Sequence, residues 1–542
     1  MSTQFAPKIL ASVVLLAVLH TGFAQTADTL QKIDALFSHY HNATPGVAVL
    51  VARGNRVIYE KAFGLANLEY NVPNTTATIF ECGSVSKQFT AAAVLLLARE
   101  GKLALNDDIR KYIPELPVYD APITIQHLLN HTSGLKDWGV IYGIGGWPRS
   151  TRVYTQELSF DIVFKQQSLN FTPGSAYSYS NSNYVLLVLL VERVSGMSLA
   201  EFTERHFFKP LGMAHTKWRD NFREIILHRA TAYTRNQQGK YIQDMPFENV
   251  HGPGGLLTTT RDLLRWNQLL ETHELLGDEW SLIRIQPGRL NNGKEIAYAA
   301  GLMIGQVNGF REISHSGATA GYRAWLAYYP QKKLSIVMLS NDGTFNPTRT
   351  GRELAEIFLG KSETLTFQPP NRRASLTETD LNKWTGTWRH TTEPEFFTIE
   401  QNANHLRLGN TLLVPVHRDT LYSNNFILIA LSDKNISRQT ANGREAYVKM
   451  PAPDKSPAYL QQIAGWYRSH DAGVTIEIKV QGDELWVHRK PGDVFRLMPV
   501  YRDAYRWEGM GLMELSRDRR GNITGFELSL PRAWRVPFVR IK

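Results

Sequence analysis

Ser84 and Lys87 are the residues whose types and spacing most directly suggest covalent chemistry in this chain. They stand at the mouth of an apolar run over residues 92–98, which Gly101 closes, so the pattern predicts a helix that begins near Gly83. A spacing of three residues places both side chains on one face of such a helix. A serine hydroxyl becomes a nucleophile when an adjacent base takes its proton, and a partly buried lysine can have a pKa low enough to serve. The same pair also arises by chance in a long chain, so it needs support from elsewhere.

A second candidate is the hydroxyl-rich and amide-rich cluster around Tyr179 and Asn181, which follows a Pro173-Gly174 turn. It directly precedes a very apolar run over residues 185–194, which predicts a buried helix that stops near Gly196. Polar groups beside a buried helix are costly unless they are hydrogen-bonded or used. From the residues alone, an elaborate helix cap and a functional role both remain open.

Two further features have simple structural interpretations. His127 and His131 have the i, i+4 spacing of some metal ligands, but no carboxylate or third histidine supports them nearby, so we interpret them as structural. Cys82 is the only cysteine, so no intramolecular disulfide can form, and we expect it to pack beneath the start of the helix rather than to react. The sequence therefore predicts no metal and no cofactor.

Composition limits the classes of function. The net charge of +10 is scattered along the chain rather than gathered in a cluster, which argues against nucleic-acid binding. Residues 1–24 carry Lys8, an apolar stretch and small residues ending at Ala24, the pattern of a secretory signal peptide. No other run approaches the length of a membrane span. We therefore expect a periplasmic or secreted protein with no stable membrane anchor after cleavage, and with no signal for its oligomeric state.

The order of predicted elements indicates one α+β domain over residues 26–365. A hairpin is predicted at 47–59, helices follow, and strands return over 297–340, so strands from both ends should join in one antiparallel sheet. Residues 135–170 show weak periodicity and are predicted to form loops over a cleft.

Beyond a linker at 366–373 the chain is strand-like and repeats itself. Gly386-Thr387-Trp388-Arg389 is answered by Gly465-Trp466-Tyr467-Arg468. The pattern predicts two copies of a small all-β unit, barrel-like, at residues 376–450 and 457–542. Neither copy shows catalytic residues, so we expect them to support the first domain or to gate its substrate.

Three ordered motifs, Ser84-x-x-Lys87, Tyr179-Ser180-Asn181 and His315-Ser316-Gly317, together resemble the penicillin-recognising serine hydrolases. The resemblance covers roughly residues 40–345. Within the family it points to the branch of class C β-lactamases, D,D-carboxypeptidases, D-aminopeptidases and esterases, since Tyr-x-Asn stands in the second motif. It implies a β-lactamase-like fold. A rival α/β-hydrolase reading would need a Gly-x-Ser-x-Gly elbow, and the nearest match, at Gly196, sits at a helix end instead.

The resemblance also implies roles for these residues. Ser84 would form an acyl-enzyme, Tyr179 would act as the general base, and Asn181 would orient Lys87 and the substrate amide. The strand with His315 and Gly317 would form the opposite wall of the cleft. The backbone N–H groups of Ala318 and Ser84 would make an oxyanion hole there.

His315 departs from the lysine that many β-lactamases and transpeptidases carry in the third motif. A histidine is largely neutral near pH 7, which weakens the case for substrates with a carboxylate. We therefore expect a small-molecule or peptide substrate with an amide or ester bond, with D-amino-acid substrates favoured. A β-lactamase or D,D-carboxypeptidase is the first alternative, and a penicillin-binding or cell-wall peptide sensor without turnover is the second. The resemblance to D-aminopeptidases further implies that a loop of one barrel shapes the pocket.

Overall fold

The computed structural model describes residues 28–147, 152–360, 374–402, 405–423, 425–440, 443–490 and 492–541. They form two compact units. Of the described residues, the first unit comprises 28–134, 152–160 and 171–360, and the second comprises 135–147, 161–170 and those from 374 onward. The predicted signal peptide lies outside the described residues. None of the described helices is long and apolar enough to cross a membrane.

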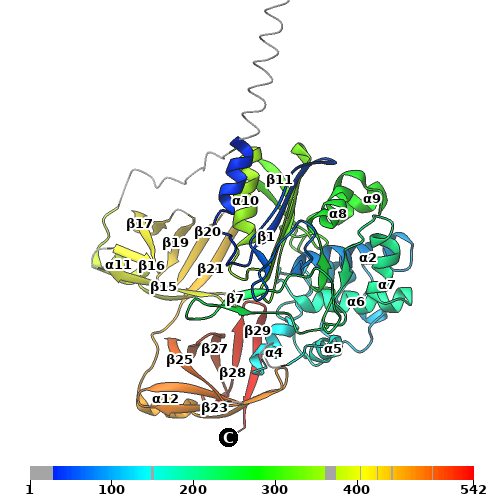
Figure 1. Ribbon diagram of the computed structural model, residues 1–542. Helices are drawn as coiled ribbons and strands as arrows, with labels where there is room; N and C mark the ends of the chain where they lie inside the picture. The colour runs from blue at the N-terminus through cyan, green and yellow to red at the C-terminus, as the bar shows by residue number, and fades with distance from the viewer. Residues whose placement is uncertain are drawn as a thin grey trace, which may run out of the picture. The chain divides into compact units, whose positions relative to one another are not determined.

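A six-stranded antiparallel sheet organises the first unit, in the order β10-β11-β12-β13-β1-β2 (Figure 1). Strand β1 pairs with β13 along its length, from Val47 opposite Ser340 to Arg53 opposite Leu334. This confirms that strands from both ends of the domain join in one sheet. The strands are β1 (Val47–Arg53), β2 (Arg56–Phe63), β10 (Met303–Val307), β11 (Phe310–Thr319), β12 (Tyr322–Tyr329) and β13 (Leu334–Ser340).

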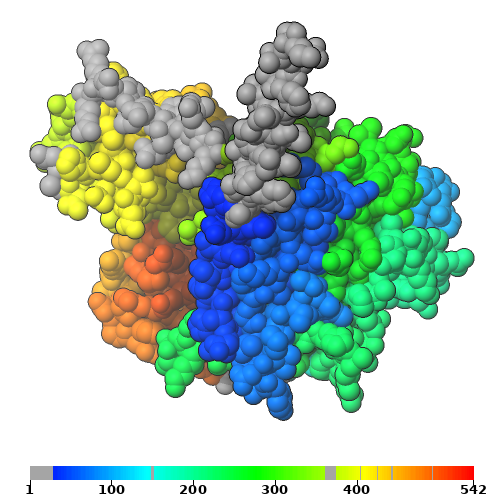
Figure 2. Space-filling model, turned by 45° about the horizontal axis from the view of Figure 1, so that its top comes forward, coloured from blue at the N-terminus to red at the C-terminus, as the bar shows by residue number. Residues whose placement is uncertain are grey.

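Helices cover the sheet, which explains why the run from Val47 to Ala52 is buried at every position. On one face, the three valines of β1 (Val47, Val49 and Val51) pack with Phe37, which follows a helical stretch over residues 28–36, and with Leu354 of α10 (Pro347–Leu359). Figure 1 shows this stretch and α10 side by side, and Figure 2 shows the stretch as a dark blue strip on the surface. Helix α8 (Thr260–Thr272) also contacts the sheet.

Helix α2 (Lys87–Arg99) is the buried helix that the sequence predicts, and it packs against α6 (Asn181–Ser195). Its residues from Lys87 to Ala98 are all buried. The short 3-10 helix η1 (Gly83–Ser86) precedes α2, so Ser84 lies on a tight turn that leads into the helix.

The other elements of the first unit are short. They are β3 (Leu65–Asn67), β4 (Val72–Pro73), β5 (Phe80–Glu81), η2 (Ile109–Lys111), α3 (Ile125–Leu129), α7 (Leu199–Thr203), the π-helical turn η3 (Glu204–Phe208), β6 (Lys217–Trp218), β7 (Tyr233–Arg235), β8 (Tyr241–Gln243), β9 (Leu256–Thr258), α9 (Gly277–Arg284) and η4 (Pro330–Lys332).

The second unit contains two closed eight-stranded antiparallel barrels, which confirms the predicted pair of all-β repeats. Gly386 and Gly465, which correspond in the sequence repeat, each open the first strand of a barrel after a short helix. The first barrel follows α11 (Glu378–Trp384) and consists of β14 (Gly386–His390), β15 (Phe396–Asn402), β16 (His405–Leu408), β17 (Thr411–His417), β18 (Thr420–Tyr422), β19 (Ile427–Ser432), β20 (Asn435–Thr440) and β21 (Gly443–Lys449). The second follows α12 (Pro457–Ile463) and consists of β22 (Gly465–Ser469), β23 (Val474–Gln481), β24 (Glu484–Arg489), β25 (Asp493–Tyr501), β26 (Ala504–Trp507), β27 (Gly511–Arg517), β28 (Ile523–Leu530) and β29 (Ala533–Arg540).

The stretch predicted as loops, residues 135–170, instead contains α4 (Trp138–Ile144) and α5 (Gln156–Phe164). Part of it packs within the second unit. Nη1 of the buried Arg489 donates to the carbonyl oxygens of Gly143 and Ile144, both at 3.0 Å, where α4 ends. The weak periodicity of this stretch therefore reflects short helices, and α4 is held by a strand of a barrel that is distant in the sequence.

A buried ion pair joins two segments of the first unit. The Arg219 guanidinium donates to the Glu81 carboxylate from Nε at 2.8 Å and from Nη2 at 3.1 Å, and both side chains are almost fully buried. Nη2 also lies 3.3 Å from Glu248 Oε1. The backbone N–H of Arg219 donates to the Gly255 carbonyl at 2.7 Å. Arg219 thus fixes β5, three residues before Ser84, relative to the loop that ends at Gly255.

We expect Arg219→Met to destabilise the first unit by about 3–5 kcal/mol, because it leaves the Glu81 carboxylate buried without its bidentate partner. Urea denaturation followed by far-UV circular dichroism measures this, since most described helices lie in the first unit. Arg349→Met is the matched control, because Arg349 pairs with Glu353 on the exposed surface of α10. An Arg219→Met protein that unfolds at the wild-type midpoint would contradict the assignment.

We expect Arg489→Ala to loosen α4, because it removes both hydrogen bonds to the end of that helix. Amide hydrogen exchange over residues 138–146 should accelerate by roughly tenfold or more. Arg496→Ala removes a surface pair with Glu484 in the same barrel and should leave this exchange unchanged. Equal protection of α4 in both variants would show that Arg489 does not hold it.

Candidate active site

The nucleophile candidate and its lysine meet at the junction of η1 and α2. Lys87 Nζ lies 3.3 Å from Ser84 Oγ, as the i, i+3 spacing predicts. Ser84 is half-buried, whereas Lys87 is fully buried. The Ser84 side chain is therefore accessible to a substrate, and the ammonium reaches it from the interior.

Two carbonyl oxygen atoms orient the Lys87 amine. Nζ donates to the Pro253 carbonyl oxygen at 2.6 Å and to Asn181 Oδ1 at 2.8 Å, and both of these oxygens can only accept. Two N–H bonds are thereby directed at carbonyl groups, so the next tetrahedral position of the nitrogen faces Ser84. As an ammonium, Lys87 donates there and stabilises an alkoxide. As an amine, it presents its lone pair to the hydroxyl proton.

The start of η1 lies against β11 with no room for side chains. A Cβ atom added to Gly83 would lie 2.6 Å from the Ala318 nitrogen, and one added to Gly317 would lie 2.0 Å from the Cys82 carbonyl oxygen. Gly83 also has a φ of +51°, which favours glycine. These two glycines therefore allow the backbone segments that carry Ser84 and Ala318 to adjoin.

Two backbone N–H groups belong to the segments that meet at this contact. Thr319 pairs with Tyr322 across a two-residue turn, so Ala318, the next residue along β11, directs its N–H away from β12. The Ser84 N–H lies in the first turn of η1, where an N–H has no partner inside the helix. Because these two N–H groups belong to adjoining backbone segments, they are the candidates for the oxyanion hole that the resemblance implies.

Tyr179 lies at the centre of an aromatic cluster. Its ring centroid is 4.8 Å from Lys87 Nζ, 4.2 Å from the ring of His131 and 6.2 Å from the ring of His315. The structure therefore brings the predicted base beside the predicted lysine. Cation–π attraction to the ring also helps to hold the buried ammonium.

His315 is buried in β11 and makes two hydrogen bonds. Nδ1 lies 2.6 Å from the Ser316 carbonyl oxygen, and Nε2 lies 3.1 Å from the hydroxyl of the buried Tyr298. Burial, reinforced by the charge of Lys87, lowers the pKa of His315 to about 4. The third motif therefore presents a neutral imidazole at the position where many β-lactamases and transpeptidases carry a lysine.

Sequence reasoning missed three participants. The Pro253 carbonyl is a backbone group, and only the neighbouring Gly254-Gly255 could have pointed to its loop. Tyr298 lies outside the three motifs, so the sequence did not indicate that it contacts His315. His131, interpreted as structural, has Nδ1 as acceptor for the backbone N–H of Ser180 at 3.2 Å, so it supports the bend that carries Tyr179.

The competing sequence candidates have structural explanations. His127 Nδ1 accepts from the backbone N–H of Thr124 in a capping box, and Ser198 caps α7 together with Glu201. Within the described part of the chain, no group of three histidine, cysteine or acidic side chains could hold a metal ion.

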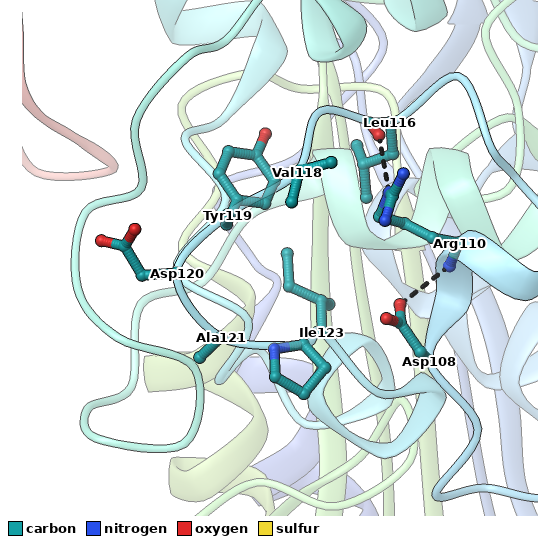
Figure 3. Close-up of a pocket in the computed structure, with 9 residues that line it drawn as sticks. Asp108, Arg110, Leu116, Val118, Tyr119, Asp120, Ala121 and Ile123 are labelled. Atoms are coloured by element: carbon teal, nitrogen blue, oxygen red, sulfur yellow. Dashed lines mark hydrogen bonds between the residues drawn. The ribbon is translucent and has the colours of Figure 1, made fainter.

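A separate hollow of about 180 Å³ is formed by the stretch from Asp108 to Ile123 (Figure 3). Inside it, Arg110 Nε donates to the Leu116 carbonyl at 3.0 Å, and the Arg110 backbone N–H donates to Asp108 at 2.9 Å. None of the predicted site residues lines this hollow. These hydrogen bonds join residues of the same loop, so they have a structural explanation. We therefore look for the chemistry at Ser84 rather than in this hollow.

Comparisons with known proteins identify the family and the fold. The Beta-lactamase family model matches residues 30–360. Penicillin-binding protein 4* of Bacillus subtilis (strain 168) is 31% identical over 318 residues, which cover 56% of this chain and 68% of that protein. The match to Protein flp of Staphylococcus aureus covers 64% of that relative's length.

Two solved structures share the fold. The octameric penicillin-binding protein homologue from Pyrococcus abyssi has a TM-score of 0.55 at 22% identity, covering 87% of this chain and 99% of that one. A D-amino acid amidase from Ochrobactrum anthropi SV3 has a TM-score of 0.52 at 19% identity, covering 61% of this chain and 98% of that one. The family model spans more than half of the chain and contains Ser84, Lys87, Tyr179, Asn181 and His315. The chain therefore belongs to the Beta-lactamase family of penicillin-recognising serine hydrolases.

Proposed function

We propose that this chain is an exported serine hydrolase that forms an acyl-enzyme with an amide, peptide or ester, with D-amino-acid substrates favoured. The observation that carries the proposal is the 3.3 Å approach of Lys87 Nζ to Ser84 Oγ, with the amine already oriented by Asn181 and Pro253. The similarity in fold to a D-amino acid amidase supports the substrate class. Export rests on the predicted signal peptide.

In the proposed reaction, Ser84 Oγ attacks the substrate carbonyl carbon while its proton passes to Tyr179. The N–H groups of Ser84 and Ala318 stabilise the oxyanion that develops. Tyr179 then returns the proton to the leaving amine or alcohol, which completes the acyl-enzyme. A water molecule, deprotonated by the same base, releases the acid and restores Ser84. Throughout, Lys87 stabilises the negative charge that develops on the neighbouring oxygens.

We expect Ser84→Ala to lower kcat/KM by about a thousandfold or more, because no other group replaces the nucleophile. Labelling with a fluorophosphonate and mass spectrometry should place the adduct on Ser84 in the wild type and give none in the variant. Ser175→Ala, at an exposed turn, should label like the wild type. Absence of any wild-type adduct on Ser84 contradicts the covalent mechanism, and a penicillin adduct that never hydrolyses indicates a sensor without turnover.

We expect His315→Lys to raise turnover of nitrocefin relative to p-nitrophenyl butyrate by about tenfold, because a fixed positive charge then faces the carboxylate of the β-lactam. His315→Gln, which is also neutral, should leave this ratio near that of the wild type. Assays with both substrates on the three proteins measure it. An unchanged ratio in His315→Lys would show that charge at this position does not set the preference.

A further inference from the structure

Arg284, the last residue of α9, is a buried cation without a counter-ion in the described part of the chain. The residue is only 3% exposed. Burial lowers the pKa of Arg284 to about 10, and no carboxylate of the described residues offsets this effect. The guanidinium still carries its charge near neutral pH. A buried charge of this kind is costly unless an opposite charge compensates it.

The buried Arg219 shows how the same unit compensates another arginine, through two hydrogen bonds to the Glu81 carboxylate. Arg284 makes a single hydrogen bond among the described residues, from Nη2 to Gln88 Oε1 at 3.2 Å. Its Cζ atom also lies 4.7 Å from the ring centroid of Trp266. Cation–π attraction offsets part of the desolvation cost, but neither group carries a negative charge. The surroundings of Arg284 therefore lack one negative charge.

The orientation of the Gln88 amide follows from its neighbours. Trp266 Nε1 donates to Gln88 Oε1 at 3.1 Å, beside the hydrogen bond from Arg284. Both neighbours can only donate, so the amide oxygen faces them and the Nε2 group faces away. Gln88 is buried, and its Nε2 has no hydrogen-bond partner among the described residues. The same is true of Arg284 Nε.

The two unpartnered nitrogens lie on either side of one hydrogen bond. Nε is two covalent bonds from Nη2 in the planar guanidinium, and Nε2 is two covalent bonds from Oε1 in the amide. Because Nη2 and Oε1 are 3.2 Å apart, both donors border the same small region between α9 and α2. This region offers N–H donors and a positive charge, so its natural occupant is an acceptor with a negative charge.

We infer that Arg284 and Gln88 form a buried binding site for one small monovalent anion of the halide class. One negative charge balances the one guanidinium charge. A halide ion accepts from several N–H groups, whereas a water molecule would need acceptors for its own protons and would leave the charge uncompensated. The ring of Phe89 stacks on Trp266 with centroids 3.9 Å apart, so the surroundings are closely packed and apolar. Such surroundings favour a small ion over a phosphate or a carboxylic acid.

The site lies beside the start of α2, because Gln88 directly follows Lys87. Helices α2 and α9 contact each other, so the anion compensates a charge that folding buries at their junction. A ligand that binds only the folded state stabilises that state in proportion to its occupancy. The anion therefore stabilises the first unit, and its binding does not depend on the reaction at Ser84.

Urea denaturation in sodium chloride, and in sodium gluconate of equal ionic strength, tests this site, since gluconate is too large to enter it. The wild-type midpoint should be higher in about 0.1 M chloride than in gluconate by roughly 0.5 M urea. Equilibrium unfolding empties the site, so slow exchange of a buried ion does not affect the result. Equal wild-type midpoints in the two salts overturn the inference.

Gln88→Glu places a carboxylate beside Arg284, so the chain itself supplies the missing charge. Its midpoint should be the same in both salts. Arg284→Met removes the positive charge and should also abolish the difference. Arg99→Met is the matched control, because Arg99 is exposed at the other end of α2 and donates to the Leu275 carbonyl at 2.9 Å. This variant should keep the wild-type response to chloride.

A chloride response in Gln88→Glu equal to that of the wild type would assign the effect to the protein surface and overturn the inference. This comparison holds even if Arg284→Met does not fold, because Gln88→Glu keeps the size of the side chain and both of its neighbours.

Bromide gives a direct view of the site. Crystals grown in sodium bromide should show an anomalous peak at the bromine edge within about 3.5 Å of Arg284 Nε and Gln88 Nε2, and Gln88→Glu crystals should lack it. Density there without an anomalous signal identifies a water molecule and overturns the inference. A bromide peak together with a wild-type midpoint that does not respond to chloride means binding at crystal concentration only, which also overturns it.

Discussion

The backbone of Cys82 and Gly83 lies against the backbone of Gly317 and Ala318, and the rest of the site depends on this contact. A methyl group on Gly317 would lie 2.0 Å from the Cys82 carbonyl oxygen. The two backbone segments can therefore adjoin only because residue 317 has no side chain. The contact joins the start of α2 to the open edge of β11. In the proposed reaction, this contact lets the Ser84 hydroxyl and the N–H groups of Ser84 and Ala318 act on one substrate carbonyl.

Holding a lysine in the interior beside this contact requires groups that do not themselves react. Lys87 is stabilised by the Pro253 carbonyl, and the loop of Pro253 is in turn fixed at Gly255 by the backbone of Arg219. Arg219 also grips Glu81, three residues before Ser84. One buried ion pair therefore sets the spacing between the nucleophile and the acceptor that orients its lysine. A buried ion pair adds little net stability, but removal of one partner leaves a buried charge without compensation. The two segments that Arg219 and Glu81 join are therefore held at a fixed spacing.

The parts of the structure that could be predicted from sequence are those with local signals. The β1–β2 hairpin, α2 and the barrel repeat follow from alternation, apolar runs and glycines, and Ser84, Lys87 and Asn181 follow from their motifs. Helix α6 begins at Asn181 rather than near residue 185. The extended backbone of Ser180 precedes its first turn, and the polar Asn183 can lie buried in that turn because it accepts a hydrogen bond from Ser133. Tyr298 and the Pro253 carbonyl left no signal, since one lies in an aperiodic segment and the other is backbone.

The membership of residues 135–148 in the second unit is the clearest case of a property absent from local sequence. Ser133 Oγ donates to Asn183 at 2.5 Å within the first unit, and two residues later the chain belongs to the other unit. Beyond that point, the backbone N–H of Asp137 donates to the Arg532 carbonyl at 3.0 Å, and Lys136 Nζ lies 2.9 Å from Ser168 Oγ. Ordering a stretch of this length costs about 1–2 kcal/mol per residue in backbone entropy, which its own short helices cannot offset. The second barrel offsets that cost, so the path of the chain after Ser133 is determined by residues nearly four hundred positions away in the sequence.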